Sequence, residues 1–219
     1  MKIKISNSIV IDTNKRPLLV AEISGNHNGN KSLFLNHIVE AGKSGADLVK
    51  IQTYEPNDIT LNSKNTSFKI KNGIWKNKYL WDLYTKAKTP FDWHHDAFKI
   101  AKKNKICLFS TPFSERGVNF LEKFNVPLYK ISSFEITDLK LIKAIAKTKK
   151  PVIVSTGMAN LNEIRQCINT IKKFHNKIII LHCISGYPTP FEDINLKTIN
   201  LLKHKLNTEL IGLSDHTDG

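Results

Sequence analysis

The stretch that decides the fold runs from residue 152 to residue 183 and reads VIVSTGMANLNEIRQCINTIKKFHNKIIILHC. It begins with one short apolar run, Val152–Ser155, and ends with another, Ile178–Cys183. Between them, Leu161–Phe174 has the apolar spacing of an amphipathic helix. Short runs rich in Val, Ile and Leu are typical of strands buried on both faces of a parallel sheet. The stretch therefore predicts a strand–helix–strand unit.

The same alternation extends outward in both directions. The further strand candidates are Leu18–Ile23, Leu48–Gln52, Ile106–Ser110, Leu128–Ile131 and Leu210–Leu213. The further helical patterns are Leu33–Lys43, Trp93–Lys103, Glu115–Phe124, Leu139–Lys147 and Leu196–Leu206. Asp138 and Asn162 are placed as helix caps. Repeated alternation of this kind predicts an α/β fold, a (β/α)₈ TIM barrel incomplete at its C-terminus, with about seven of its eight strands present.

The alternative is an open doubly wound sheet. That fold carries a glycine-rich phosphate loop with G-x-G-x-x-G spacing after its first strand. Here the corresponding turn, Ser24–Gly29, reads SGNHNG and lacks that spacing. The barrel is therefore favoured over the open sheet.

Two segments stand outside the alternation. Lys2–Ile11 alternates around Asn7 and Ser8, which predicts a small hairpin. Glu55–Tyr79 is rich in Asn, Lys and Ser and follows the second strand candidate. An irregular connection of that length is usually a functional lid or disordered.

Composition restricts the possible classes of function. The chain has 219 residues, a net charge of +14 and three cysteines without metal spacing, which we expect to be reduced thiols. No apolar run approaches the roughly 20 residues of a membrane helix, so we expect a cytoplasmic protein without a membrane partner. The lysines are spread along the whole chain without interleaved aromatics. We therefore expect a solvated basic surface that attracts small polyanions, rather than a nucleic-acid partner.

Polar side chains collect at the carboxyl ends of the strand candidates. In chain order they are Glu22, Lys50, Gln52, Ser110, Lys130, Ser133, Glu135, Ser155, His182, Ser185, Tyr187, Ser214, Asp215 and His216. In a parallel barrel all these strand ends share one rim, which is where barrel enzymes carry out their chemistry. Lys50 and Lys130 are the most informative because each interrupts an apolar run, where a charge needs a partner or a ligand.

The histidines differ in how strongly they point to function. His216, between Asp215 and Thr217 just past a strand, is the best candidate for a metal ligand. His182 fits either a core histidine or the site. We interpret His94 and His95, on an amphipathic helix, as surface residues. We expect His27 to stiffen its Asn-rich turn.

Taken together, these residues describe a site for a doubly anionic substrate. Lysines and hydroxyls would hold phosphate and carboxylate groups. A metal on His216 would polarise a carbonyl, and a carboxylate would stabilise a developing cation or activate water.

Seven sequence motifs, in order along nearly the whole chain, resemble those of the sialic acid synthase family. They are residues 21–29 (AEISGNHNG), 50–54 (KIQTY), 109–113 (FSTPF), 129–131 (YKI), 154–158 (VSTGM), 182–190 (HCISGYPTP) and 212–217 (GLSDHT). Within the family, Ser24-Gly25 and the stretches 73–76 (GIWK) and 81–84 (WDLY) resemble the pseudaminic acid synthases.

The resemblance implies an activity. C3 of phosphoenolpyruvate attacks the open-chain aldehyde of a 2,4-diacetamido-2,4,6-trideoxy hexose, water adds at C2, and phosphate leaves with C–O cleavage. The product would be a nine-carbon nonulosonic acid, pseudaminic acid. N-acetylneuraminate or legionaminate synthesis is the alternative within the family. The implied cofactor is a divalent ion, manganese first, with magnesium or cobalt as alternatives.

The resemblance also implies residue roles. The residues implied to bind phosphoenolpyruvate are Lys50, Gln52, Lys130, Ser133, Ser155, Ser185 and Ser214. Ser185 stands where the family usually has Asn. Glu135 would face the reacting carbons, Glu22 would position water or sugar, and Tyr187 would line the sugar side. His216 would be one of two metal-binding histidines.

The family pattern places further parts beyond Gly219: the second metal histidine, an eighth strand and a C-terminal antifreeze-like domain. The expected organisation is therefore one truncated barrel domain over residues 1–219. A homodimer is expected for the full-length family member. The 219-residue chain alone is expected to lack synthase activity and to be poorly soluble at its open sheet edges.

Two readings from other classes stay open at this stage. One is a Schiff-base aldolase with Lys130 or Lys50 as nucleophile. The other is a basic nucleic-acid-binding domain, which salt-sensitive retention of DNA or RNA would support.

Overall fold

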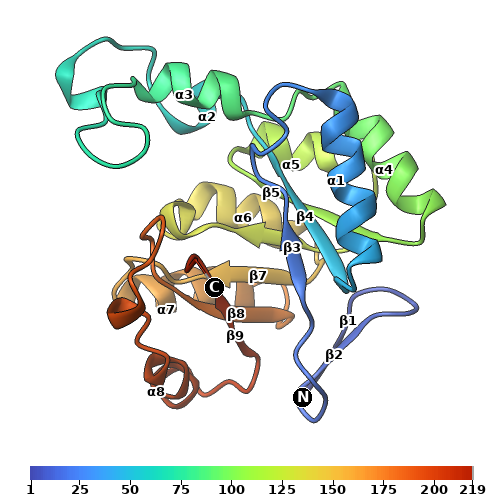
Figure 1. Cartoon of the computed structure of the whole chain (residues 1–219). Helices are drawn as coiled ribbons and strands as arrows, with labels where there is room; N and C mark the ends of the chain where they lie inside the picture. The colour runs from blue at the N-terminus through green and yellow to red at the C-terminus, as the bar shows by residue number, and fades with distance from the viewer. Residues whose placement is uncertain (219) are drawn as a thin grey trace. The chain divides into compact units, whose positions relative to one another are not determined.

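The computed structural model describes residues 1–218 and divides into two compact units. The central unit is Leu19–Val126, and the terminal unit combines Met1–Leu18 with Pro127–Gly219. Each unit is built from parallel strands that alternate with helices along the chain (Figure 1). Seven parallel strands alternating with helices were predicted from the sequence, and the two units contain three and four of them respectively.

The central unit carries a three-stranded parallel sheet in chain order. Its strands are β3 (Val20–Glu22), β4 (Leu48–Thr53) and β5 (Cys107–Pro112). Its helical elements are α1 (Lys31–Lys43), α2 (Pro56–Ile59), η1 (Thr66–Phe68), α3 (Leu80–Ala87), α4 (Trp93–Lys103) and α5 (Glu115–Glu122). Helix α1 packs against β4 and against α4, which lies beside it (Figure 1).

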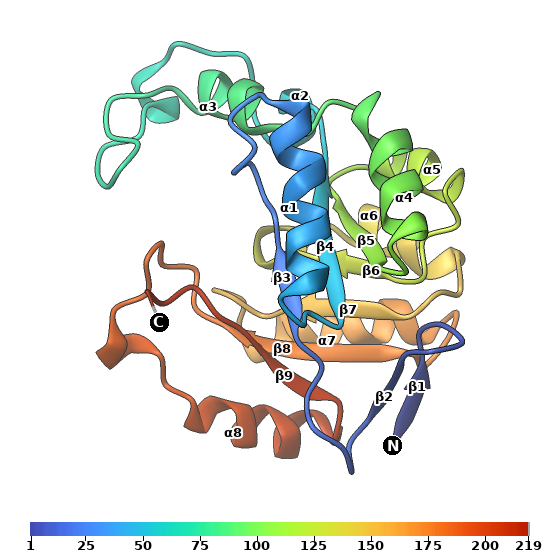
Figure 2. The same cartoon turned by 45° about the vertical axis from the view of Figure 1, so that its right-hand side comes forward.

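The terminal unit carries four parallel strands, also in chain order. They are β6 (Tyr129–Ile131), β7 (Val152–Ser155), β8 (Ile178–Cys183) and β9 (Ile211–Ser214). The helical elements between them are η2 (Ser133–Glu135), α6 (Leu139–Lys147), α7 (Leu161–Lys172), η3 (Phe191–Asp193) and α8 (Lys197–Leu206). Helix α6 packs against α7, and α8 packs along β8 and β9 (Figure 2). The predicted hairpin forms between β1 (Lys2–Lys4) and β2 (Val10–Asp12).

Apolar strands covered by amphipathic helices explain both cores. In the central unit, Val49 and Ile51 of β4 pack with Phe34 and Ile38 of α1, and all four are fully buried. In the terminal unit, every residue of β7 is buried, as the run VIVS predicts. These cores fix the strands, and the strand ends in turn position the polar residues that follow them.

The segment after β4 is more ordered than its composition suggests. Glu55 caps α2 through a capping box with Asp58, and Lys69 pairs with Tyr79 in an antiparallel bridge. Helix α3 follows directly, and none of the helical patterns identified in the sequence covers it.

The prediction that His94 lies on the surface is wrong. Its side chain is fully buried, and Nε2 lies 2.8 Å from the Thr53 hydroxyl, which itself lies 2.6 Å from Ser110 Oγ. Burial lowers the pKa of His94 to about 4, so the ring is neutral at physiological pH. The phenyl rings of Phe91 and Phe120 cover it, a tertiary effect that helix periodicity does not reveal.

Candidate active site

The predicted site residues divide between the two units. Glu22, Lys50 and Gln52 belong to the central unit. The terminal unit holds Lys130, Ser133, Glu135, Ser155, Ser185, Tyr187, Ser214 and His216. Within each unit most of these residues lie near or just beyond the carboxyl ends of parallel strands, as predicted; Lys50 is the third of the six residues of β4.

In the central unit the predicted residues form an ion pair. Glu22 and Lys50 are register partners on β3 and β4, and their side chains form a salt bridge. The Ser24 amide donates to Glu22 Oε1 at 2.9 Å, and Lys50 Nζ donates to Thr111 Oγ1 at 3.4 Å. Gln52, two residues beyond Lys50 on β4, is half-buried on the same side of the strand. The charge that interrupts the β4 apolar run is therefore matched by a carboxylate.

Lys130, in the terminal unit, differs from Lys50 in that it is buried without a carboxylate partner among the described residues. It is 5% exposed, and none of the described residues forms an ion pair with it. Burial lowers the pKa of its ammonium group to about 8, while the nearby Cys183 and Glu135 act in the opposite direction. A buried, mostly protonated lysine without a salt bridge is costly unless an anion binds beside it.

Loops after three different strands converge beside this lysine. Gly157 has a positive φ of +43°, and a Cβ there would lie 2.3 Å from Ser133 Cβ and 2.8 Å from Ser185 Oγ. The absence of a side chain at Gly157 thus leaves a small cradle between two serines. The hydroxyls of Ser155 and Ser185 are buried and have no hydrogen-bond partner among the described residues.

Glu135 adds an ionisable group near Lys130. Its Oε2 is also buried without a partner among the described residues. Burial raises the pKa of this carboxyl to about 7, an effect that Lys130 only partly opposes. Near neutral pH, Glu135 is therefore present in both protonation states and can donate or accept a proton.

Cys183, at the end of β8, lies within the same group. The Ser133 hydroxyl donates to its sulfur at 3.3 Å, and His216 Nδ1 lies 4.0 Å from it. Burial alone would raise the pKa of the thiol, but hydrogen bonds from His216, Ser133 and Ser214 outweigh it and lower the pKa to about 7. The sequence analysis did not include Cys183 among the site residues; its position directly after His182 on the predicted rim was the available signal.

His216 is held in a defined tautomer. Its Nδ1 lies 2.7 Å from the Ile184 carbonyl oxygen, so Nδ1 carries the proton and, in the neutral ring, Nε2 keeps its lone pair. Metal-binding histidines are commonly oriented in this way by a backbone carbonyl. The ring of Tyr187 lies over the imidazole, with centroids 4.3 Å apart. Residues 1–218 contain no cluster of three or more His, Cys, Asp or Glu side chains able to hold a metal ion.

Two further histidines, His182 and His27, have structural partners. His182 Nε2 lies 2.8 Å from the Ile194 carbonyl oxygen, which resolves the open choice in favour of a satisfied core histidine. His27 is fully buried and its Nδ1 accepts from the Gly29 amide, which stiffens the turn as expected.

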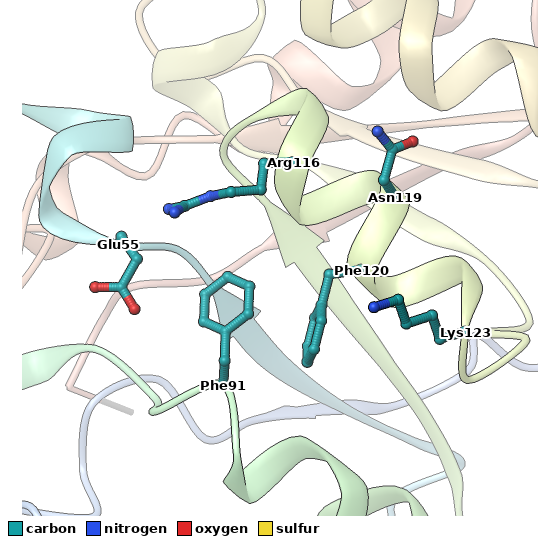
Figure 3. A pocket seen from close by; sticks show the side chains of 6 residues that line it. All are labelled: Glu55, Phe91, Arg116, Asn119, Phe120 and Lys123. Carbon is teal, nitrogen blue, oxygen red and sulfur yellow. The ribbon is translucent and has the colours of Figure 1, made fainter.

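Two cavities of about 360 Å³ lie away from these residues. One, in the central unit, is lined by Glu55, Phe91, Arg116, Asn119, Phe120 and Lys123 (Figure 3). Its two phenyl rings lie 4.5 Å apart, Arg116 pairs with Asp58 at 3.2 Å, and Glu55 pairs with Lys88. The second, between α6 and α7, is lined mainly by neutral polar side chains. The paired charges in the first make it a packing junction for the segment after β4, and neither contains a predicted site residue.

Comparisons with known proteins identify relatives of this chain. A pseudaminic acid synthase of Campylobacter jejuni strain 81-176 is 46% identical over 95% of this chain and 61% of its own length. An N,N'-diacetyllegionaminic acid synthase of Campylobacter jejuni is 38% identical over 94% of this chain and 62% of its own. The chain thus spans about three fifths of the length of these relatives. No described helix is long and apolar enough to cross a membrane.

A solved structure extends the comparison to the fold. The crystal structure of N-acetylneuraminic acid synthetase from Leptospira borgpetersenii, in complex with citrate, matches 100% of this chain and 71% of its own with a TM-score of 0.87 at 30% identity. This match confirms the predicted α/β fold class. The model of the NeuB family matches residues 37–219, most of the chain. The chain belongs to the NeuB family.

Proposed function

We propose that the protein condenses phosphoenolpyruvate with a 2,4-diacetamido-2,4,6-trideoxy hexose to give pseudaminic acid and phosphate. The observation that carries the proposal is the anion cradle of the terminal unit, which we define as Lys130, Ser133, Ser155, Gly157 and Ser185. It combines a buried ammonium group lacking a salt bridge among the described residues with two hydroxyls that lack partners there. The 46% identity to a pseudaminic acid synthase supports this sugar.

The cradle suits a small dianion. Lys130 supplies the charge, and the serine hydroxyls supply donors at a site that excludes water from the lysine. An anion bound here would raise the pKa of Lys130 again and hold it in the charged form. We propose that Ser214, beside Cys183 at the end of β9, also binds phosphoenolpyruvate.

Glu135 and Glu22 are proposed to act on the reacting atoms. With a pKa of about 7, Glu135 can receive a proton from the water that adds at C2 and return one to the leaving group. Glu22, which forms a salt bridge with Lys50, is proposed to position water or sugar.

His216 is proposed to bind a divalent metal ion, manganese first, through Nε2. When bound, the ion would polarise the sugar aldehyde. The chain itself contributes the Ile184 carbonyl that fixes the tautomer and the Tyr187 ring that packs over the imidazole. A cytoplasmic location and a homodimeric state are part of the same proposal.

The test is product formation by the native gene product from phosphoenolpyruvate labelled with ¹⁸O at the bridging oxygen. The proposal requires a nine-carbon keto acid by mass spectrometry, ¹⁸O in the released phosphate, and loss of turnover after chelation of divalent ions. Replacing the sugar by N-acetylmannosamine or the legionaminate precursor distinguishes the alternative synthases. Turnover with these sugars only would contradict the pseudaminate assignment.

One observation also fits a Schiff-base aldolase: burial lowers the pKa of Lys130, which makes its neutral amine more accessible. Borohydride in the presence of pyruvate would then trap a covalent adduct on Lys130. Absence of such an adduct, together with label in the phosphate, excludes the aldolase.

A further inference from the structure

The three loops that meet at Gly157 share a second pattern. Each places an exposed apolar side chain one or two residues after a cradle residue: Phe134 after Ser133, Met158 after Gly157 and Tyr187 after Ser185. The exposed fractions of these residues are 59%, 66% and 53%, against 7% for Ser133. Single exposed apolar residues are common on protein surfaces. Their recurrence on three successive loops around one polar cradle is the unusual feature.

The local backbone separates the two kinds of side chain. Ser133, Phe134 and Glu135 form the 3₁₀ turn η2, in which successive side chains point about 120° apart. Ser133 is buried and Glu135 largely so, which leaves Phe134 directed outward. At Gly157 the contact with Ser133 brings the two loops together, so Met158 and Phe134 each follow a residue of the same close contact. Buried polar side chains and exposed apolar side chains therefore follow one another on the same loops.

We propose that Phe134 and Met158, with Tyr187 beside them, form an apolar rim that contacts the methyl groups of the amino-sugar substrate and selects for them. The inference rests on the proposed function. The charged groups of phosphoenolpyruvate would bind the anion cradle, and this substrate has no large apolar group that could contact the rim. The proposed sugar has three methyl groups, two on acetamido substituents and one at C6, whereas N-acetylmannosamine has one. An apolar rim beside an anion cradle therefore matches the sugar with more methyl groups.

The effect expected follows from the size of the contact. One methyl or methylene group in an apolar site typically changes specificity by about 10–200-fold. Because Phe134 and Met158 are half-exposed, we expect the lower end of that range. Phe134→Ala is expected to lower kcat/KM for the trideoxy sugar about tenfold and that for N-acetylmannosamine less than threefold. The KM for phosphoenolpyruvate is expected to stay within about twofold of the wild-type value.

The experiment measures kcat/KM for both sugars. The proteins compared are the wild-type native gene product and its variants Phe134→Ala, Met158→Ala and Phe134→Leu. Leu201→Ala is the matched control, because Leu201 is 54% exposed on the outer helix α8. Thermal melts confirm that the variants fold. The rim is supported if Phe134→Ala and Met158→Ala both have a weaker preference for the trideoxy sugar than the wild type. The preference should be partly restored in Phe134→Leu and should equal the wild-type value in Leu201→Ala.

The contrary results are distinct from one another. Equal loss with both sugars, no loss, or a change confined to phosphoenolpyruvate would overturn the rim assignment while leaving the proposed function intact. A change in oligomeric state at unchanged sugar preference would also overturn it, and would identify the rim as a protein contact. If the wild-type protein makes no keto acid with either sugar, the proposed function fails and the rim assignment fails with it.

Discussion

At the scale of single residues, the two lysines that interrupt apolar strands have different surroundings. Both were predicted to need a partner or a ligand. Lys50 has a carboxylate partner in Glu22, whereas Lys130 belongs to a cradle in which two hydroxyls, those of Ser155 and Ser185, lack partners among the described residues. The difference could not be predicted from the sequence, because both lysines occupy the second or third position of similar runs. The two lysines differ in which loops pack beside them. That packing depends on tertiary contacts such as the one between Gly157 and Ser133.

Gly157 gives a direct test of the cradle at this scale. An added methyl group would occupy the space between Ser133 and Ser185, so Gly157→Ala is expected to weaken phosphoenolpyruvate binding at least tenfold and to lower stability by about 2–4 kcal/mol. Gly45→Ala is the control, since Gly45 also has a positive φ, +92°, but a Cβ there meets nothing within 4 Å. It should lose only about 1 kcal/mol. Similar losses of stability and unchanged binding in both variants would contradict the cradle.

Glu135 predicts a pH dependence of stability. Burial raises its pKa in the folded protein from 4.5 to about 7, so the folded state binds more protons than the unfolded state between those values. Its contribution to stability is therefore present below pH 4.5 and is lost as the pH rises to about 7. Glu135→Gln is expected to remove this loss, and to be about 1–3 kcal/mol more stable than wild type at pH 8 but equal at pH 4.5. Urea unfolding at both pH values measures the difference, and a variant less stable at pH 8 would refute the assignment.

At the scale of elements, the sequence predicted most of the architecture. Predicted and observed helices agree closely for α4 and α6, because strong amphipathic spacing coincides with clear ends. Helix α3 was missed because it adjoins the long irregular segment after β4 and has no fully buried residue. The cap of α7 was assigned two residues too late: Asn160, not Asn162, caps the helix, since the capping box with Glu163 requires a spacing of three.

The corrected cap of α7 yields a prediction with a built-in control. The Asn160 side chain accepts from the amides of Asn162 and Glu163, while Glu163 accepts from the Asn160 amide at 2.8 Å. Asn160→Ala is expected to lower the free energy of unfolding by about 1 kcal/mol. Asn162→Ala, in the first turn itself, should change it by less than about 0.5 kcal/mol. Equal effects in denaturant unfolding would show that the cap is misassigned.

At the scale of the whole molecule, the resemblance seen in ordered motifs proved sufficient to identify the family, since the family model covers residues 37–219. Composition and charge contributed less. A net charge of +14 attracts any small polyanion, so it cannot by itself say where phosphoenolpyruvate binds. A role for the terminal-unit cradle must therefore be separated from the general field of the protein.

Calorimetric titration of phosphoenolpyruvate into the wild-type protein, Lys130→Ala and Lys147→Ala distinguishes binding at the cradle from general attraction by the positive charge of the protein most directly. Both variants lose one positive charge, but Lys147 is an exposed residue in the last turn of α6. Losing a charge-assisted contact costs roughly 1.5–3 kcal/mol, which is about tenfold or more in affinity. The account predicts that Lys130→Ala weakens binding at least tenfold while Lys147→Ala binds within about twofold of wild type. Equal affinities in the two variants would contradict the assignment of Lys130 to phosphoenolpyruvate.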